Sequence, residues 1–181
     1  NTLDLRPSAH DYDEAIIDTL IKSSIPDAIN EIVGHPMTLF HVQIRKSMQG
    51  AGYMPWHRDT YCYDGKQVGH EPPVHKLIIY PSLDGIERPR LNVSVGSHHH
   101  MHDTQRDDVS VISRLPVKTV SSSHDGFLLF NTSIFHDTLP ETQPEGSLRI
   151  IYSFLTMDQM FSHHVGEKLH MDQMIEYERK R

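Results

Sequence analysis

The chain has 181 residues, a length that predicts one domain or one domain with a helical appendage. Hydrophobic residues make up 37% of it, enough for a packed core, so wholesale disorder is excluded. The formal net charge of −7 argues against a general binder of nucleic acid or of an anionic membrane. The unusual count is 15 histidines, which indicates either a metal protein or many solvent-facing imidazoles.

The first part of the chain has helical hydrophobic spacing over residues 8–34. A break is expected at residues 24–27, where Pro26 suits the first turn of a second short helix that Gly34 ends. The buried stripe expected on this second helix consists of Ala28, Ile29, Ile32 and Val33. Residues 1–36 are therefore expected to form an N-terminal helical segment.

From Met37 onward the sequence changes to short β-type runs separated by Gly, Pro, Asp and Ser clusters. Strands are predicted at 38–46, 54–60, 74–81, 91–95, 109–113, 117–121, 127–131, 134–138 and 147–156. No helix-length segment interrupts them, which favours an antiparallel sandwich or barrel over residues 37–157. The tail has an apolar stripe typical of a helix, so 158–181 is expected to be a C-terminal helical segment of a single domain spanning 1–181.

One candidate site begins with His57 and Asp59 on the strand predicted at 54–60. Residues two apart on a strand project from the same face, so an imidazole and a carboxylate can address one point in space. The spacing is common by chance, and an aspartate that merely orients a surface histidine is the alternative.

Two later residues add weight to this pair. His136 lies in a β-type run far downstream, and Arg149 follows it in an otherwise apolar strand. Two histidines and one carboxylate form the facial triad of non-haem Fe(II) oxygenases. A buried arginine needs an anion, and a guanidinium suits the distal carboxylate of 2-oxoglutarate. The alternative for Arg149 is an ion pair with a structural Asp or Glu.

At three places the sequence resembles the phytanoyl-CoA dioxygenase-like branch of the Fe(II)/2-oxoglutarate-dependent oxygenases. Trp56-His57-Arg58-Asp59 is similar to its Trp-His-x-Asp motif, and residues 91–98 are similar to its Leu…Pro-Gly-Ser-His element, with Val95 in place of Pro. His136 followed by Arg149 is the third. The resemblance implies a mainly β, cupin-like double-stranded β-helix (jelly roll) with flanking helices.

The resemblance also implies a role for each matching residue. His57, Asp59 and His136 would ligate Fe(II), and Arg149 would hold the distal carboxylate of the cosubstrate 2-oxoglutarate, with O₂ as the second cosubstrate. Relatives often have a hydroxyl residue two positions after the second histidine, where Thr138 stands here. Strand alternation places Thr138 on the same side as His136.

Other side chains are weaker candidates around this site. Gln43 and Lys76 are expected to reach 2-oxoglutarate, although the face of Leu39, His41, Gln43 and Arg45 also fits an ordinary solvated surface. Arg45, Tyr61 and Arg88 are the candidate substrate contacts. Arg88 and Arg90 suit an anionic group, but Pro89 between them fits a surface loop equally well.

Two features are expected to be structural. Cys62, the only cysteine, cannot form an internal disulfide and is expected to be a packed side chain. The histidines of residues 98–102 are expected in a solvated loop rather than on a second metal.

The function these observations favour is a non-haem Fe(II)- and 2-oxoglutarate-dependent dioxygenase that hydroxylates a C–H bond of a small molecule, releasing succinate and CO₂. The alternatives are a prolyl-type protein hydroxylase and a jelly-roll metal-binding protein without 2-oxoglutarate chemistry. No stretch has the roughly 20 apolar residues of a membrane span, and residues 1–4 lack a secretion-signal pattern. We therefore expect a soluble, intracellular, cytoplasmic protein with no nucleic-acid or membrane partner; the sequence does not predict its oligomeric state.

Overall fold

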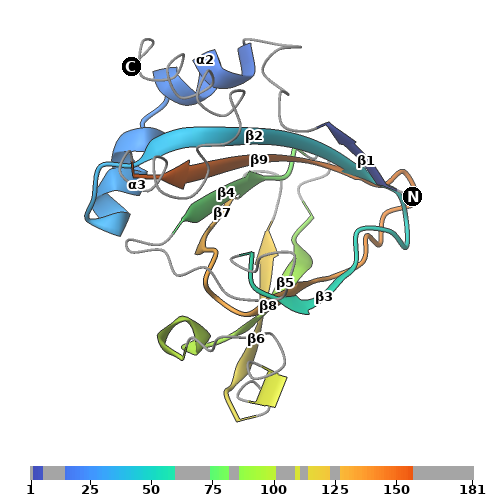
Figure 1. Cartoon of the computed structure of the whole chain (residues 1–181). Helices are drawn as coiled ribbons and strands as arrows, with labels where there is room; N and C mark the ends of the chain where they lie inside the picture. Colours follow the sequence, from blue (N-terminus) through green and yellow to red (C-terminus); the bar gives the residue numbers. More distant parts are fainter. Residues whose placement is uncertain are drawn as a thin grey trace.

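Two facing antiparallel sheets make up the fold. The computed structural model describes residues 2–5, 15–59, 74–81, 86–100, 109–110, 114–122 and 127–156. In these ranges one sheet has five strands, in the order β1-β2-β9-β4-β7, and the other has four, in the order β3-β8-β5-β6. The five-stranded sheet curves over the four-stranded one (Figure 1). This is the double-stranded β-helix (jelly-roll) arrangement predicted from the sequence.

The strands of each sheet come from distant parts of the chain. The five-stranded sheet consists of β1 (Thr2–Leu5), β2 (Thr38–Ser47), β9 (Ser147–Leu155), β4 (His75–Ile79) and β7 (Phe127–Asn131). The four-stranded sheet consists of β3 (Met54–His57), β8 (His136–Thr138), β5 (Arg88–Ser94) and β6 (Val117–Ser122). A 3₁₀ turn, η1 (Ser97–His99), follows β5. The register of β2 with β9 runs from Thr38↔Leu155 to Ser47↔Ser147 and joins the two ends of the jelly roll.

Two short helices cover the outer face of the five-stranded sheet (Figure 1). They are α2 (Ala15–Lys22) and α3 (Ile25–Val33), and α3 ends at Gly34, whose left-handed φ of 77° suits a residue without Cβ. The expected stripe on α3 is only partly correct. Ile29 is buried but Ala28 is exposed and Ile32 is 69% exposed, because the helix contacts the sheet along the narrower line of Pro26, Ile29 and Val33. Within the described ranges, no helix combines the length and apolarity needed to cross a membrane.

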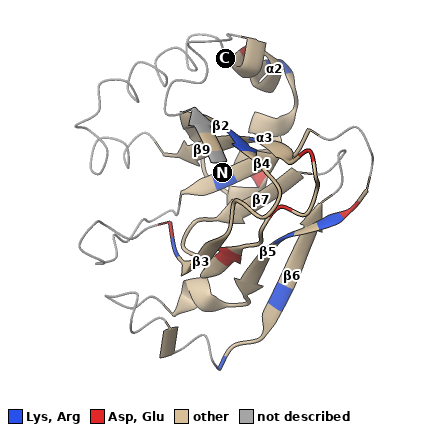
Figure 2. Cartoon of the chain, turned by 90° about the vertical axis from the view of Figure 1, so that its right-hand side faces the viewer, with Lys and Arg blue, Asp and Glu red and all other residues tan. Residues whose placement is uncertain are grey.

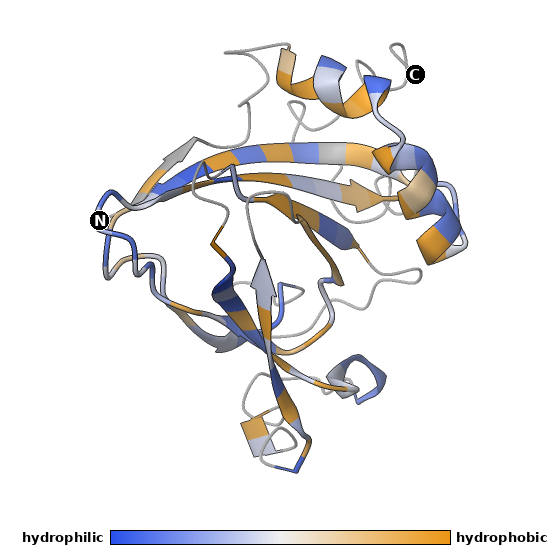
Figure 3. Ribbon diagram, turned by 180° about the vertical axis from the view of Figure 1, so that it is seen from behind, coloured by the Kyte–Doolittle hydropathy of each residue, from blue (hydrophilic) through white to orange (hydrophobic). Residues whose placement is uncertain are grey.

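Apolar side chains form two layers, one on each face of the five-stranded sheet. The outer layer packs Ile17, Leu20 and Ile29 of the helices against buried strand residues such as Leu77 and Phe154. The inner layer lies between the sheets and is smaller, because several inward positions are polar. Figure 3 shows the alternation of hydrophobic and hydrophilic residues along β2 that produces this division. The polar inner face is where a site can form.

Several element boundaries differ from the sequence predictions. The N-terminal segment expected to be helical also contributes strand β1, paired with the edge of β2. The strand predicted at 109–113 is wrong at Val109 and Ser110, which are helical, and 111–113 lie outside the described residues. Strand β5 begins at Arg88, so it includes Pro89. At this point β5 pairs only with β6, and its pairing with β8 starts at Leu91, so the missing N–H of Pro89 costs no hydrogen bond to β8. The C-terminal helix expected over 158–181 lies outside the described residues.

A bulge in β2 changes which side chains share a face. The register of β2 with β9 shifts between Leu39 and His41, which reverses the alternation at that point. Leu39 therefore joins Val42 in the outer layer, although strict alternation would place it with Gln43. Gln43 lies opposite Ile151, a residue of the inner layer, and is itself only 6% exposed. The face that carries Gln43 is thus an interior face and not a solvated surface.

The outer layer should carry much of the stability. Phe154→Ala removes a side chain that is 1% exposed, so we expect the free energy of unfolding to fall by about 3–5 kcal/mol, measured by urea denaturation. Phe127→Ala is the matched control, because Phe127 is 54% exposed, and it should cost less than about 1 kcal/mol. Equal losses in the two variants would contradict this assignment of the core.

Candidate metal centre and arginine pocket

The pairing of β3 with β8 brings two distant histidines together. His57 and His136 are partners in this antiparallel pair, and their ring centroids lie 4.4 Å apart. His136 is 3% exposed and also meets the edge of the Phe130 ring. A single strand pairing therefore brings together two histidines that lie far apart in the sequence.

Asp59 completes a cluster of three potential metal ligands. Its carboxylate oxygens lie 3.6 Å from His57 Nε2 and 3.9 Å from His136 Nε2. One ligand atom from each residue falls within 4.8 Å of the others, and among the described residues no other group of His, Cys, Asp and Glu side chains does so. The predicted triad is thus brought together in space.

Backbone carbonyls fix the orientation of both imidazoles. His57 Nδ1 lies 2.7 Å from the carbonyl oxygen of Pro55, and His136 Nδ1 lies 3.0 Å from that of Ile134. A carbonyl oxygen only accepts hydrogen bonds, so each Nδ1 carries the proton and donates it. In the neutral form of each ring, Nε2 then carries a lone pair, and it faces Asp59. This is the usual arrangement of histidines that ligate a metal.

The charges at this cluster favour an ionised carboxylate. Burial alone would raise the pKa of Asp59, but the Lys76 ammonium, 3.0 Å away, and the two imidazoles hold that pKa far below its usual range. Burial opposes protonation of His57, yet its hydrogen bond with Asp59 and the charge of Asp59 raise the pKa above the ordinary value. Burial lowers the pKa of His136, which keeps that ring neutral at pH 7.

Arg58, between the two predicted ligands, holds the surrounding loops in place. Its guanidinium is 2% exposed and donates to the carbonyl oxygens of Ser133, Ser97 and His100, and it lies 5.7 Å from the centroid of the Phe135 ring. Ser97, from the Gly-Ser-His element, accepts a hydrogen bond of 2.8 Å from the Phe135 backbone N–H. These contacts connect β3, η1 and the start of β8. Sequence reasoning did not identify this role, because the partners are backbone carbonyls of distant residues.

Loss of the Arg58 guanidinium should weaken both the fold and the metal site. Arg58→Met leaves three carbonyls without this donor, so we expect the free energy of unfolding to fall by about 3 kcal/mol or more. Affinity for Fe(II), measured by anaerobic titration of the folded fraction, should fall about 10-fold, as for other residues that orient metal ligands. The exposed Arg114 gives the control: Arg114→Met should change neither quantity. Unchanged stability in Arg58→Met would contradict the role described.

Arg149 lies on the inner face of β9 and is 6% exposed. Its Nη2 donates to Ser47 Oγ at 3.1 Å, and Tyr80 lines the same pocket. Within the described ranges it forms no ion pair with a carboxylate, so the structural ion pair considered above is not found there. Arg45 is its direct cross-strand partner, and like charges in that position repel. Burial lowers the pKa of Arg149 although Tyr80 raises it, so this buried cation is suited to an incoming anion.

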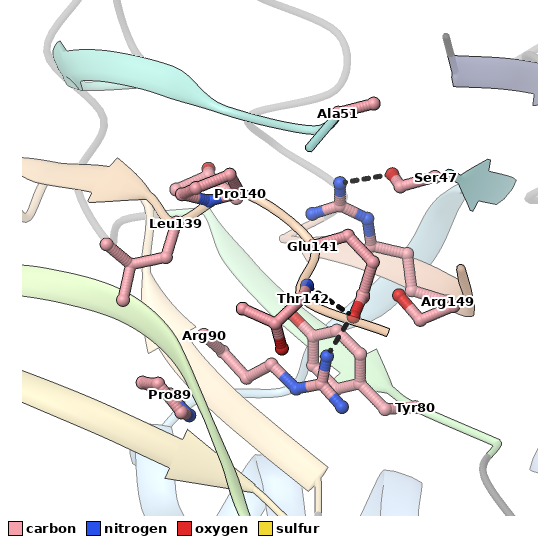
Figure 4. A pocket seen from close by; sticks show the side chains of 12 residues that line it. Ser47, Ala51, Tyr80, Pro89, Arg90, Leu139, Pro140, Glu141, Thr142 and Arg149 are labelled. Atoms are coloured by element: carbon pink, nitrogen blue, oxygen red, sulfur yellow. Dashed lines mark hydrogen bonds and ion pairs between the residues drawn. The ribbon is translucent and has the colours of Figure 1, made fainter. Parts of the chain in front are cut away.

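Arg149 lines a pocket with about 320 Å³ of empty space, partly open to solvent, that we call the arginine pocket (Figure 4). Its walls include Ser47, Tyr80, Arg90, Thr138, Glu141 and Arg149. Gly52 passes close by with a φ of 85°, and a Cβ there would lie 3.0 Å from Arg149 Nη2. The pocket thus combines two guanidinium groups with several hydroxyl groups.

The remaining candidates take different positions. Gln43, Lys76 and Thr138 are on inward-facing positions: Thr138 lines the arginine pocket, and Lys76 pairs with Asp59. Arg45 is on the same face but only partly buried, with Nη1 3.9 Å from Met54 Sδ in an exposed contact. Arg88 starts β5, donates to the Ile86 carbonyl and does not line the arginine pocket.

Other predicted features lie at the margins or outside the described ranges. The His98 and His99 rings lie 3.8 Å apart between centroids and are tilted by 42°, and His99 and His100 are exposed, as expected for a solvated loop. Tyr61 and Cys62 lie outside the described residues. Lys and Arg are spread over several elements with Asp and Glu among them (Figure 2).

Solved structures with this fold include enzymes that use iron or 2-oxoglutarate. HygX from Streptomyces hygroscopicus, with nickel and 2-oxoglutarate bound, matches with a TM-score of 0.65 and 16% identity over 87% of this chain and 70% of its own. SnoN, a non-haem α-ketoglutarate-dependent epimerase from nogalamycin biosynthesis, matches with a TM-score of 0.63 and 12% sequence identity. The match covers 85% of this chain and 61% of SnoN. EvdMO1 matches with a TM-score of 0.60 and 20% sequence identity, and the match covers 77% of this chain and 32% of EvdMO1.

These likenesses establish the fold class: the chain has the jelly-roll fold that these proteins share. It spans about three fifths of SnoN and about one third of EvdMO1. No family model matches the sequence. No curated protein matches it either.

Proposed function

We propose that this protein is a non-haem Fe(II)- and 2-oxoglutarate-dependent dioxygenase, most similar in its motifs to the phytanoyl-CoA dioxygenase-like branch. The observation that carries the proposal is the meeting of His57, Asp59 and His136 beside a polar interior that contains Arg149, a buried cation without a described carboxylate partner. Together these residues suit a metal and an anionic cosubstrate.

The three residues of the triad fit a divalent metal such as Fe(II). Two neutral imidazoles and one ionised carboxylate are the donor set of non-haem iron oxygenases, and three protein ligands leave coordination positions open. The carbonyl-bound Nδ1 atoms direct both Nε2 lone pairs toward Asp59. Iron bound there would supply the activation of O₂ for oxidation of 2-oxoglutarate and substrate.

The cosubstrate would use the inner face of the five-stranded sheet. We assign the distal carboxylate of 2-oxoglutarate to Arg149 and Thr138, both at the arginine pocket. Gln43 and Lys76 are assigned to the rest of the cosubstrate, because they lie on the same interior side and Lys76 is next to the triad. Arg149 can bind a carboxylate through two parallel hydrogen bonds, which fixes its position as well as its charge.

The substrate is proposed to be a small molecule, with Arg45, Tyr61 and Arg88 as its candidate contacts. HygX has also been solved with hygromycin B bound, which supports a small-molecule substrate for a fold of this kind. The net reaction proposed is R–H, O₂ and 2-oxoglutarate giving R–OH, succinate and CO₂. SnoN is an epimerase, so a different outcome at the same C–H bond is the second candidate.

Coupled product analysis tests the proposal. Purified protein with Fe(II), O₂ and 2-oxoglutarate should form succinate slowly without substrate, and His136→Ala should abolish this, as measured by chromatography of the organic acids. A protein that binds Fe(II) but leaves 2-oxoglutarate intact would instead be a cupin-like metal protein. Acceleration by peptides but not by small molecules would indicate a protein hydroxylase.

A further inference from the structure

The arginine pocket contains a second buried guanidinium that the proposed function does not use. Arg90 lies on β5 and is 6% exposed, so it is not part of the surface loop that its neighbour Pro89 made equally plausible. Its guanidinium carbon lies 4.1 Å from the centroid of the Tyr80 ring. Tyr80 and Arg149 line the same pocket, and the charges of both arginines oppose the rise that burial causes in the pKa of Tyr80 (Figure 4).

The hydrogen bonds of Arg90 are incomplete. Nη1 lies 3.4 Å from Glu141 Oε2, whereas Nε and Nη2 are buried and have no hydrogen-bond partner among the residues that the structure describes. Buried donors without partners are costly and uncommon in proteins. Glu141 does not depend on this pair, because its Oε1 accepts hydrogen bonds from the backbone N–H groups of Thr142 and Gln143. The carboxylate is thus held by its own loop, whereas two of the three guanidinium nitrogens have no partner among the described residues.

The charges of the pocket point in the same direction. Arg90 and Arg149 contribute two positive charges to its walls and Glu141 contributes one negative charge, so one incoming carboxylate would neutralise them. Glu141 is ionised: burial favours its neutral form, but hydrogen bonds from Ser147 and Gln143 and the charge of Arg90 together lower its pKa. A neutral ligand would leave the excess positive charge buried.

We propose that Arg90 is a second binding residue for the distal carboxylate of the cosubstrate, which it shares with Arg149, and that it selects a 2-oxo diacid over a 2-oxo monoacid. This inference rests on the proposed function for the identity of the cosubstrate. It assigns to the cosubstrate a side chain that the sequence alone offered to a substrate or to the surface.

Two ligands of equal chain length measure the contribution of Arg90. 2-Oxoglutarate and 2-oxopentanoate share the 2-oxo acid group, but only 2-oxoglutarate has the distal carboxylate. Their dissociation constants are to be measured with Fe(II)-loaded protein under anaerobic conditions. Metal-free protein is titrated with glutarate by calorimetry, which reports on the pocket without any metal chemistry.

The variants avoid leaving an unpaired carboxylate buried. Glu141→Gln removes the charge of Glu141 and should bind 2-oxoglutarate as well as wild type or better, because Arg90 is released from its pair. Adding Arg90→Met in that background should raise the dissociation constants of 2-oxoglutarate and glutarate at least about 10-fold, the range for a hydrogen bond to a charged group. The constant for 2-oxopentanoate should stay the same. Lys118→Met, on the exposed part of β6, is the control and should change none of them.

A merely structural Arg90 predicts a different pattern. The double variant would then bind both 2-oxo acids as the Glu141→Gln variant does, or would lose both equally, and either result overturns the inference while the proposed function stands. Absence of any 2-oxoglutarate binding by Fe(II)-loaded wild type would overturn the proposed function. In that case, glutarate binding that depends on Arg90 would still show a carboxylate-binding site at this pocket. If glutarate did not bind either, the inference about Arg90 would also be overturned.

Discussion

Asp59→Asn is expected to lower the affinity of the protein for Fe(II) by more than about 100-fold, because even residues that only orient metal ligands are worth about 10- to 100-fold. The substitution keeps the shape of the side chain and removes the charge that faces both Nε2 atoms. Anaerobic titration with Fe(II), followed by calorimetry, measures the change.

The neighbouring Asp137 supplies a matched control for this experiment. It also adjoins a histidine of the triad, but its carboxylate accepts hydrogen bonds from the backbone and side-chain amides of Asn92 on β5. Asp137→Asn should therefore leave Fe(II) affinity within about threefold of wild type, since it alters neither a ligand nor its orientation. If both aspartate variants lost metal to the same extent, the effect would come from local folding and not from ligation by Asp59.

Arg149→Met is expected to weaken 2-oxoglutarate binding by about 30-fold or more, while Fe(II) affinity stays at the wild-type level. Truncating one partner of a buried, hydrogen-bonded charge pair costs about 2–5 kcal/mol, and each 1.4 kcal/mol is a factor of ten. Anaerobic titration of Fe(II)-loaded protein with 2-oxoglutarate measures it. Arg149→Lys should recover only part of the affinity, because an ammonium cannot bind a carboxylate through two parallel bonds.

The stability of the same variant distinguishes binding from a structural role. Arg149 donates to Ser47 but has no described carboxylate partner, and it lies opposite Arg45. Without ligand, Arg149→Met should therefore change the free energy of unfolding by less than about 1 kcal/mol, or increase it, because a buried charge is removed. A loss of several kcal/mol would mean that Arg149 is held by a structural partner.

Local sequence patterns predicted an antiparallel sandwich or barrel, and the family resemblance specified the jelly roll and the three residues that the structure brings together. The β-type runs correspond to β2, β4, β6, β7 and β9 within a few residues. The reasoning for Asp59, however, was only partly right. Strand β3 ends at His57, so strand alternation does not place Asp59; the turn that follows does, with the Asp59 backbone N–H donating to the Thr132 carbonyl.

Long-range contacts explain what the sequence did not indicate. Arg58 binds carbonyls of residues that are distant in the chain, and Ser47 reaches Arg149 only because β2 and β9 pair. The bulge at Leu39 and His41 has no local signal such as glycine or proline, yet it decides which face Leu39 occupies. Such features depend on which strands pair and in which register, and a single sequence does not indicate this for each residue.

The most direct test of the central claim is the visible spectrum of the protein with Fe(II) and 2-oxoglutarate in the absence of O₂. Chelation of the cosubstrate by iron in the triad should give a weak charge-transfer band, which disappears in His57→Ala and needs higher 2-oxoglutarate concentrations in Arg149→Met. Protein that binds Fe(II) but shows no band, or a band that His57→Ala leaves unchanged, would contradict the assignment.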